Sequence, residues 1–326
     1  MKRIKQSLAK SLAALALAVA ATGTAHAQNF PSKPGRFVVA TQAGSASDVL
    51  ARMLTDHFTK AWGQPWVVDN RGGGSGNIGL SVAAKAAPDG HTLVFGSLGG
   101  TIINPFLFNN LDFDAIKDFE PVAFFAGIPF VIAVNNDFAA KNLGDLLAMA
   151  RAKPGTVNVA LDSSSVKVVH ALLEATANVK TFGVSYNGPA LATADTMGGR
   201  VPVIIETVGA LRQLIDGGKL RPLAITTQAS TPLLPGVPSV AEQGVPAFGE
   251  VSGWVGVMAP RGTPRNVVTQ LNAETSKFLN LPETKQRFLT MGFLMRPGSV
   301  DDFIKFIESE RNRFGPLIKA AGIKAE

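Results

Sequence analysis

The chain has 326 residues, a net charge of +7 and no cysteine. The absence of cysteine excludes disulfide bridges and thiolate chemistry. A chain of this length can bury a sizeable core and favours two domains over one.

The N-terminal residues have the pattern of a secretory signal peptide. Four Lys or Arg stand within the first ten positions, residues 12–21 are apolar, and residues 25–27, Ala-His-Ala, fit an A-x-A cleavage site. We predict that residues 1–27 are removed; the alternative, an N-terminal membrane anchor, is disfavoured because the apolar run is too short. Removing four basic and no acidic residues leaves a net charge of +3, without a basic patch for nucleic acid.

Residues 37–52 combine a strand, a small polar turn and the start of a helix. Residues 37–40 are apolar, and apolar residues recur at helical spacing from Asp48 onward. Ser45, Ser47 and Asp48 stand where a helix N-cap is expected. Free N–H groups and the positive helix end converge at such a turn, which suits a carboxylate, although an ordinary well-capped turn has the same pattern.

Predicted strands and helices alternate along the rest of the chain. The further strands are expected over residues 66–70, 92–97, 121–134, 157–161, 201–206, 223–226 and 254–258. After the helix that ends near residue 62, further helices are expected over residues 80–87, 143–152, 168–177, 267–279 and 302–321, with one more beginning near residue 189. Residues 98–101 are expected to form a loop, and the alternation predicts a parallel α/β sheet.

Residues 74–79 match the dinucleotide-binding fingerprint Gly-x-Gly-x-x-Gly. In a Rossmann unit the motif lies at the first strand–helix turn, and an acidic residue follows about 20 residues later. Here it follows the second strand, and the nearest downstream acid is Asp89. We therefore interpret it as a tight turn that lets a short helix pack close to the sheet, and we expect no nucleotide cofactor.

Residues 157–177 repeat the first pattern, with a strand, the hydroxyl-rich turn Asp-Ser-Ser-Ser and a helix. His57, His91 and His170 follow residue 27, and their spacing does not suit a metal site. Asp162, Ser163 and His170 are hydrolase residue types, but the Gly-x-Ser-x-Gly elbow is absent. We expect a protein that is not an enzyme; a secreted hydrolase of an ester or amide is the alternative.

Eight short motifs carry a family resemblance, in a fixed order along the chain. They are Gly-Gln-Pro (63–65), Asp-Asn-Arg-Gly (69–72), Pro-Asp-Gly-His-Thr-Leu (88–93), Asn-Pro (104–105), Asp-Phe-x-Pro-Val (118–122), Lys-Leu-Arg-Pro-Leu-Ala (219–224), Val-Pro-Ser-Val-Ala-Glu (237–242) and Gly-Thr-Pro (262–264). With these motifs the chain resembles the periplasmic solute-binding proteins of tripartite tricarboxylate transporters, the Bug-type receptors. The resemblance covers essentially the whole chain after residue 27.

The resemblance implies a type II periplasmic-binding-protein fold, with two α/β lobes joined by two crossing strands. Lobe 1 would comprise residues 28–130 and 253–326, and lobe 2 residues 131–252. The implied protein is a periplasmic monomer without cofactor or metal. It would close on a small carboxylate (an organic acid, aromatic acid or amino acid) and deliver it to integral-membrane transporter subunits.

The resemblance also implies the ligand-binding residues. They are Gly44, Ser45, Ser47, Asp48 and Ser97 in lobe 1, and Ser163, Ser164, Ser165, His170, Tyr186, Asn187, Gly188 and Glu206 in lobe 2. We expect His170 also to satisfy the start of its helix.

Four departures from the family pattern concern the ligand rather than the fold. Ala-Thr-Gln-Ala-Gly-Ser at residues 40–45 replaces Pro-Phe-x-x-Gly-Gly, and the turn at residues 162–165 has no glycine. Asn187 replaces the usual Lys, and Glu206 replaces the commoner Asp. If Glu206 faces the cleft, it favours a ligand amine or hydroxyl over a second carboxylate; the alternative is a surface ion pair.

Overall fold

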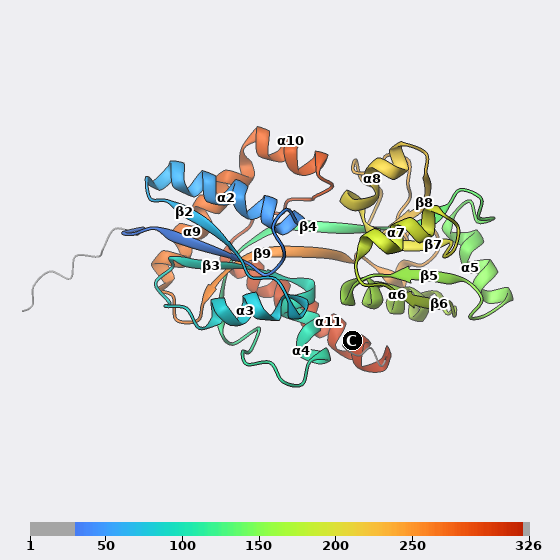
Figure 1. Cartoon of the computed structure of the whole chain (residues 1–326), viewed down its shortest axis with the longest axis horizontal. Coiled ribbons are helices and arrows are strands. Elements are labelled where there is room, and N and C mark those ends of the chain that lie inside the picture. Colours follow the sequence, from blue (N-terminus) through green and yellow to red (C-terminus); the bar gives the residue numbers. More distant parts are fainter. Residues whose placement is uncertain (1–29, 322–326) are drawn as a thin grey trace, which may run out of the picture.

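The computed structural model describes residues 30–321, so the predicted signal peptide lies outside the described residues (Figure 1). Its strands are β1 (Gly35–Val39), β2 (Trp66–Asn70), β3 (Thr92–Ser97), β4 (Phe119–Asn135), β5 (Asn158–Leu161), β6 (Phe182–Ser185), β7 (Val203–Thr207), β8 (Leu220–Ile225) and β9 (Ser252–Pro260). Its helices are α2 (Ala46–Trp62), α3 (Asn77–Ala84), α4 (Asn104–Leu107), α5 (Leu143–Ala152), α6 (Ser164–Ala177), α7 (Pro189–Met197), α8 (Val208–Asp216), α9 (Arg265–Asn280), α10 (Pro282–Thr290) and α11 (Val300–Ala321). Between residues 30 and 321, no helix is long and apolar enough to cross a membrane.

Strand β4 links the two halves of the molecule. The strands follow one another in the order β2-β1-β3-β9-β4-β7-β5-β6, and β8 also pairs with β4. Residues 119–129 of β4 pair with β9, whereas residues 130–135 pair with β7 and β8. Figure 1 shows β4 and β9 running from the half that holds β1–β3 toward the half that holds β5–β8.

Parallel strands form the outer part of each half. β1 pairs in parallel with β2 and β3, and β5 pairs in parallel with β6 and β7. The central strands β1 and β5 are largely buried, which explains their apolar runs, whereas the edge strands β2 and β6 are partly exposed. Along β1, Phe37 and Val39 pack on the side of α2, while Val38 packs on the side of α3. The alternation of side chains along a strand therefore supplies both cores.

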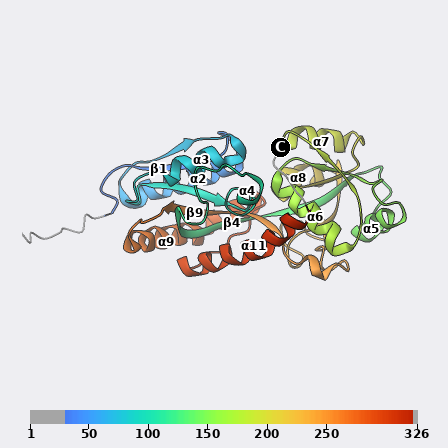
Figure 2. The same cartoon turned by 90° about the horizontal axis from the view of Figure 1, so that it is seen from below.

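Helix α11 reaches from the first half to the second. Figure 2 shows its C-terminal end beside α6, and the two helices are in contact. Phe303 and Phe314 belong to one buried cluster with Val38 of β1 and Val159 of β5. The apolar packing is therefore continuous between the halves through α11.

Most predicted elements are present with changes of their bounds, but strand β6 and helices α4 and α8 were not expected. The expectation of a parallel sheet is also only partly correct, because β4 and β9 run antiparallel to the strands that they pair with. Residues 98–103 form a wide helical turn in place of the expected loop, and Ser97 begins it by accepting the Gly100 N–H at 3.0 Å. Helix α10, which begins at Pro282, was not expected. Helix α6 starts at Ser164 instead of residue 168, because Ser163 accepts the Val166 N–H at 3.3 Å and caps it.

Candidate functional site

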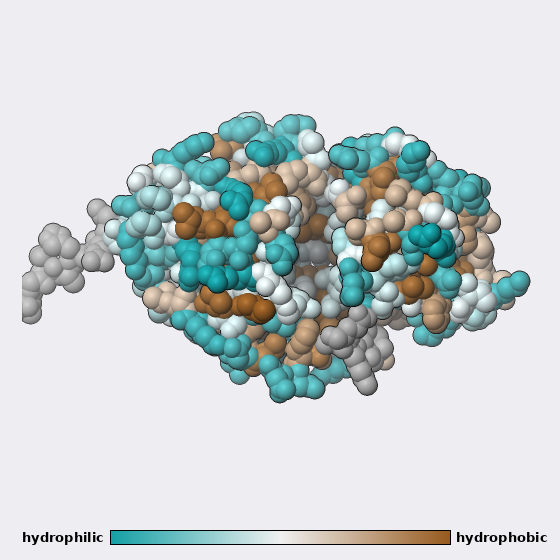
Figure 3. Space-filling view, in the orientation of Figure 1, coloured by the Kyte–Doolittle hydropathy of each residue, from teal (hydrophilic) through white to brown (hydrophobic). Residues whose placement is uncertain are grey.

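A cavity of about 770 Å³ lies between the two halves, and Figure 3 shows the hollow that separates them. Its lining residues come from both halves and are Gln42, Gly73, Ser75, Phe108, Asp162, Ser163, Ser164, Lys167, Tyr186, Asn187 and Gly188. Except for Phe108 and Lys167, they lie in or beside the turns that follow β1, β2, β5 and β6. The carboxyl ends of parallel strands are where open α/β folds bind their ligands.

The turn before α2 is held by short-range hydrogen bonds. Ser45 caps the helix, because its Oγ accepts the Asp48 N–H at 3.2 Å. The same Oγ lies 2.6 Å from Thr41 Oγ1. Gly44 has a φ of 82°, a conformation that a residue with a side chain rarely adopts. The predicted residues Gly44 and Ser45 thus lie next to Gln42, which lines the cavity.

Asp48 shapes this turn from within the protein. It is 3% exposed, and its carboxylate accepts the Gly44 N–H at 2.9 Å and Asn70 Nδ2 at 3.0 Å. Arg52 also donates to it, at 3.1 Å from Nε. Burial raises the pKa of Asp48, but the hydrogen bonds from Arg52, Gly44 and Asn70 outweigh burial and keep the pKa below its ordinary value. Asp48 therefore positions the turn, while the partly buried Ser47 precedes it in the first turn of α2.

The glycine-rich turn after β2 lines the cavity through Gly73 and Ser75. The buried Asn104 holds it, since its Nδ2 donates to the Ser75 carbonyl at 3.0 Å. A Cβ on Gly79 would lie 2.7 Å from the Ala40 Cα, so only glycine lets α3 approach β1 this closely. This packing agrees with our interpretation of a tight turn. The sequence analysis did not predict that Gly73 and Ser75 line the cavity, although their turn follows β2, which pairs with β1.

The N-terminal turn of α6 contributes Ser163 and Ser164 to the cavity. Ser97 and Ser165 both lie near Gly99, because a Cβ on Gly99 would be 3.4 Å from Ser165 Oγ and 3.9 Å from Ser97 Oγ. Both serines therefore lie where the 98–103 turn contacts α6. Neither is among the residues that line the cavity.

The segment after β6 supplies three predicted residues, Tyr186, Asn187 and Gly188, which all line the cavity. The Tyr186 hydroxyl donates to Asp195 Oδ2 at 2.9 Å, and Arg200 Nε donates to the other oxygen of that carboxylate at 2.9 Å. Burial and the adjacent Asp195 carboxylate raise the pKa of Tyr186. The ring of Tyr186 is thus fixed at the wall of the cavity in its neutral form.

Two carboxyl groups lie at the ends of the neighbouring strands β5 and β7. Asp162 lines the cavity and shares a hydrogen bond with the side chain of Glu206. Glu206 is 6% exposed and accepts the Thr207 N–H through Oε1. Burial, together with the adjacent Asp162, raises the pKa of Glu206 to about 8. Glu206 is therefore neutral at pH 7, lies outside the cavity lining, and forms no surface ion pair.

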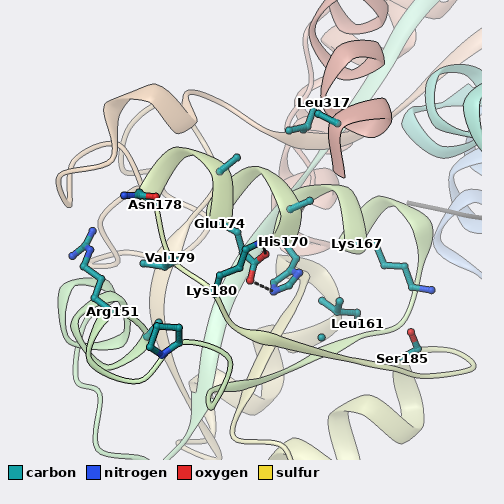
Figure 4. Close-up of a pocket in the computed structure, with 16 residues that line it drawn as sticks. Arg151, Leu161, Lys167, His170, Glu174, Asn178, Val179, Lys180, Ser185 and Leu317 are labelled. Carbon is teal, nitrogen blue, oxygen red and sulfur yellow. Dashed lines mark hydrogen bonds and ion pairs between the residues drawn. The ribbon is translucent and has the colours of Figure 1, made fainter. Parts of the chain in front are cut away.

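His170 lies in a different cavity, of about 820 Å³, between α6, α5, β6 and the end of α11 (Figure 4). Its Nε2 is 2.6 Å from Thr181 Oγ1 and 3.7 Å from Glu174 Oε1. Burial lowers the pKa of His170. The expectation that His170 satisfies the start of its helix is wrong, because Ser163 caps α6 and His170 lies in the second turn.

The separation of the two cavities bears on the hydrolase alternative. Ser163 lines the cavity between the halves, whereas His170 lines the other one. The hydrogen-bond partner of His170 is Thr181. Ser163 and His170 are thus not brought together as nucleophile and base, which such a mechanism requires. In the part of the chain that the structure describes, no group of three or more His, Asp or Glu is placed to hold a metal.

Comparisons with known proteins show a matching family and similar structures. Residues 50–323 match the family described as "Tripartite tricarboxylate transporter family receptor". A relative from Pseudomonas sp. (strain P51), the "UPF0065 protein in tcbD-tcbE intergenic region", is 36% identical over 94% of this chain and 91% of its own length.

Two solved structures from R. palustris are also similar. Rpa4515 with adipate has a TM-score of 0.81 and 32% identity, covering 91% of this chain and 99% of that one. MatC (Rpa3494) with bound malate has a TM-score of 0.76 and 30% identity, covering 89% of this chain and 100% of that one.

Proposed function

The chain belongs to the tripartite tricarboxylate transporter receptor family, as its motifs predict, and we propose that it captures a small carboxylate in the cavity between its halves. The predicted α/β periplasmic-binding-protein fold is confirmed by the likeness to solved solute-binding proteins. The observation that carries the proposal is that turns after strands of both halves line one cavity. Gln42 comes from the turn before α2, and Ser163 and Ser164 come from the start of α6.

The chemistry of these turns suits an anion. The first N–H groups of a helix have no intrahelical acceptor, and the positive end of the helix dipole lies beside them. Ser163 caps α6 through the Val166 N–H, which leaves the N–H groups of Ser164 and Ser165 in the first turn. The turn at Gly44 and Ser45 stands at the start of α2 in the other half. A carboxylate held between them would contact both halves.

We extend the proposal to the predicted division into lobes, with residues 28–130 and 253–326 in lobe 1 and residues 131–252 in lobe 2. The exchange of strand partners near residue 130 of β4 supports this boundary. The hinge would lie in β4 and β9, because few residues need to change conformation there while each lobe stays rigid. We further propose that the receptor acts in the periplasm as a monomer and delivers its ligand to membrane transporter subunits; the predicted signal peptide and the family support this proposal.

The receptor is proposed to release its ligand unchanged. The separation of Ser163 from His170 supports binding without catalysis. Recovery of every bound carboxylate in unaltered form, measured by mass spectrometry after incubation, is the expected result. Formation of an alcohol or amine product from an ester or amide would instead support the hydrolase.

A thermal-shift screen against mono- and dicarboxylates tests the binding function. A ligand at 100 times its Kd stabilises the native state by about 2.7 kcal/mol, which for a chain of this size raises the Tm by about 4 °C. Ser164→Leu and Ser45→Leu should each abolish this shift, because a bulky side chain fills the turn. Thr290→Leu, an exposed substitution on α10, is the matched control and should bind as the parent does. Unchanged binding in both Ser164→Leu and Ser45→Leu would show that the site lies elsewhere.

A further inference from the structure

The charged side chains in the lining of the cavity are one acid and one base. Asp162 ends β5, and Lys167 lies one turn into α6; the other lining residues are uncharged. Arginine, which binds carboxylates through two parallel hydrogen bonds, does not occur among these lining residues. One of the two carboxylates of a dicarboxylate ligand would therefore have no guanidinium to pair with.

Asp162 is the acid of the lining, and Glu206 lies behind it. Glu206, whose pKa burial and the adjacent Asp162 raise, shares a hydrogen bond with Asp162. The carboxylate of Asp48 in the other half instead accepts hydrogen bonds from three residues. A ligand that donates to Asp162 adds a charge-assisted hydrogen bond, and a ligand that brings a second carboxylate adds repulsion between like charges.

We propose that Asp162 selects carboxylates whose other end carries a hydrogen-bond donor, an amine foremost or a hydroxyl, and rejects a second carboxylate at that place. This inference rests on the proposed carboxylate-binding function. It transfers to Asp162 the preference that the sequence suggested for Glu206. Glu206 lies behind Asp162 and acts as a positioning residue, because the ligand touches Asp162.

The pair of carboxyl groups makes this preference depend on pH. Glu206, with a pKa of about 8, is protonated in the empty protein at pH 7, and an amine brought against Asp162 favours loss of that proton. The groups that face Asp162 around the cavity are Lys167 and the neutral Tyr186, while Gln42 and Ser75 of the other half carry no charge. Affinity for an amine should therefore rise between pH 6 and pH 8, with release of a proton.

Calorimetric titration with probes of equal length tests the selectivity. One series is 6-aminohexanoate, 6-hydroxyhexanoate and adipate; the other is 4-aminobutyrate, 4-hydroxybutyrate and succinate. In at least one series the amine should bind at least tenfold more tightly than the dicarboxylate at pH 7. Asp162→Asn should reduce this ratio to below threefold. Asp216→Asn, which removes an exposed carboxylate on α8 paired with Arg212, is the control and should retain the parent ratio.

Glu206→Gln separates the positioning role from a structural one. It should keep the preference for the amine at pH 7 and lose the increase of affinity toward pH 8. A parent protein that binds the dicarboxylate as tightly as the amine overturns the inference, as does an Asp162→Asn variant that keeps the tenfold ratio.

Different results contradict the proposed function and this inference. If none of the six probes binds, the tightest carboxylate of the thermal-shift screen decides: a ligand without amine or hydroxyl overturns the inference, and one whose affinity falls in Asp162→Asn supports it. If no carboxylate binds at all, the proposed function itself is contradicted, and the inference falls with it.

Discussion

Asp48 and Asp162 are both acids at a strand–helix turn, but their surroundings are opposite. Asp48 accepts hydrogen bonds from Gly44, Arg52 and Asn70, whereas Asp162 lines the cavity and shares a hydrogen bond with the neutral Glu206. A turn sequence does not reveal this difference, because the donors to Asp48 include Asn70, which comes from the next strand. We therefore assign Asp48 to the architecture of the turn and Asp162 to the ligand.

Replacing Asp48 tests its structural role. Asp48→Ala leaves the Gly44 N–H, Arg52 and Asn70 without their acceptor, and we expect the free energy of unfolding to fall by about 1–3 kcal/mol. Chemical denaturation measures this loss. Asp56→Ala, at an exposed position of the same helix, should unfold as the parent does. Equal stability of the two variants would show that the carboxylate of Asp48 does not hold the turn.

Glu206 should make stability depend on pH. Its pKa is raised from 4.5 to about 8, so between these values the folded chain holds a proton that the unfolded chain releases. The contribution to stability is complete below about pH 4.5 and is lost as the pH rises through about 8. The Tm of Glu206→Gln should therefore fall less than that of the parent between pH 5 and pH 8. Parallel curves for the two proteins would contradict the raised pKa.

Among the helices, the position of the cap of α6 decides which of its residues line the cavity between the halves. We predicted a start near residue 168, which would have placed His170 at the helix end beside the serines. Capping by Ser163 starts α6 at Ser164, and His170 then lies in the second turn, beside Thr181. The alternation of strands and helices was thus predictable from apolar periodicity. The side of α6 on which His170 lies was not predictable, because it depends on which residue caps the helix.

The contact between α3 and β1 gives a test at the level of elements. Gly79→Ala places a Cβ about 2.7 Å from the Ala40 Cα, a backbone atom that cannot move alone. We expect a loss of stability of about 1–3 kcal/mol from overpacking. Weaker ligand binding should accompany it, because Gly73 and Ser75 of the adjoining turn line the cavity. Substitution of the neighbouring, half-exposed Ile78 by Ala is the control; an equally small effect of both changes would contradict the close packing.

For the molecule as a whole, the fold was predictable and the composition of the cavity was only partly so. The motifs and the strand–helix alternation led to the correct family and fold. The turn at Ser163 was identified because it repeats the pattern of the first turn, and Tyr186 was identified through the family resemblance. Gln42, Phe108 and Lys167 were missed, because their membership in the lining depends on how the two halves approach each other, which has no local signal in the sequence.

The arrangement of the halves predicts a motion. A ligand that contacts both lobes binds the closed form better and must shift the population toward it. We expect the radius of gyration measured by solution scattering to decrease when a saturating carboxylate is added. The Ser164→Leu variant, which should not bind, should show no change. A parent protein that binds ligand with an unchanged radius of gyration would contradict the proposed hinge in β4 and β9.

The crystal structure of the complex with the tightest carboxylate tests the central claim most directly, because the described residues 30–321 form a cavity beside His170 that is similar in size to the one between the halves. The account predicts the ligand between the halves. Its carboxylate should lie within hydrogen-bond distance of the turns at Gly44–Ser45 and Ser163–Ser164, and its donor group should face Asp162. A carboxylate bound in the cavity beside His170, with the space between the halves empty, would contradict the account.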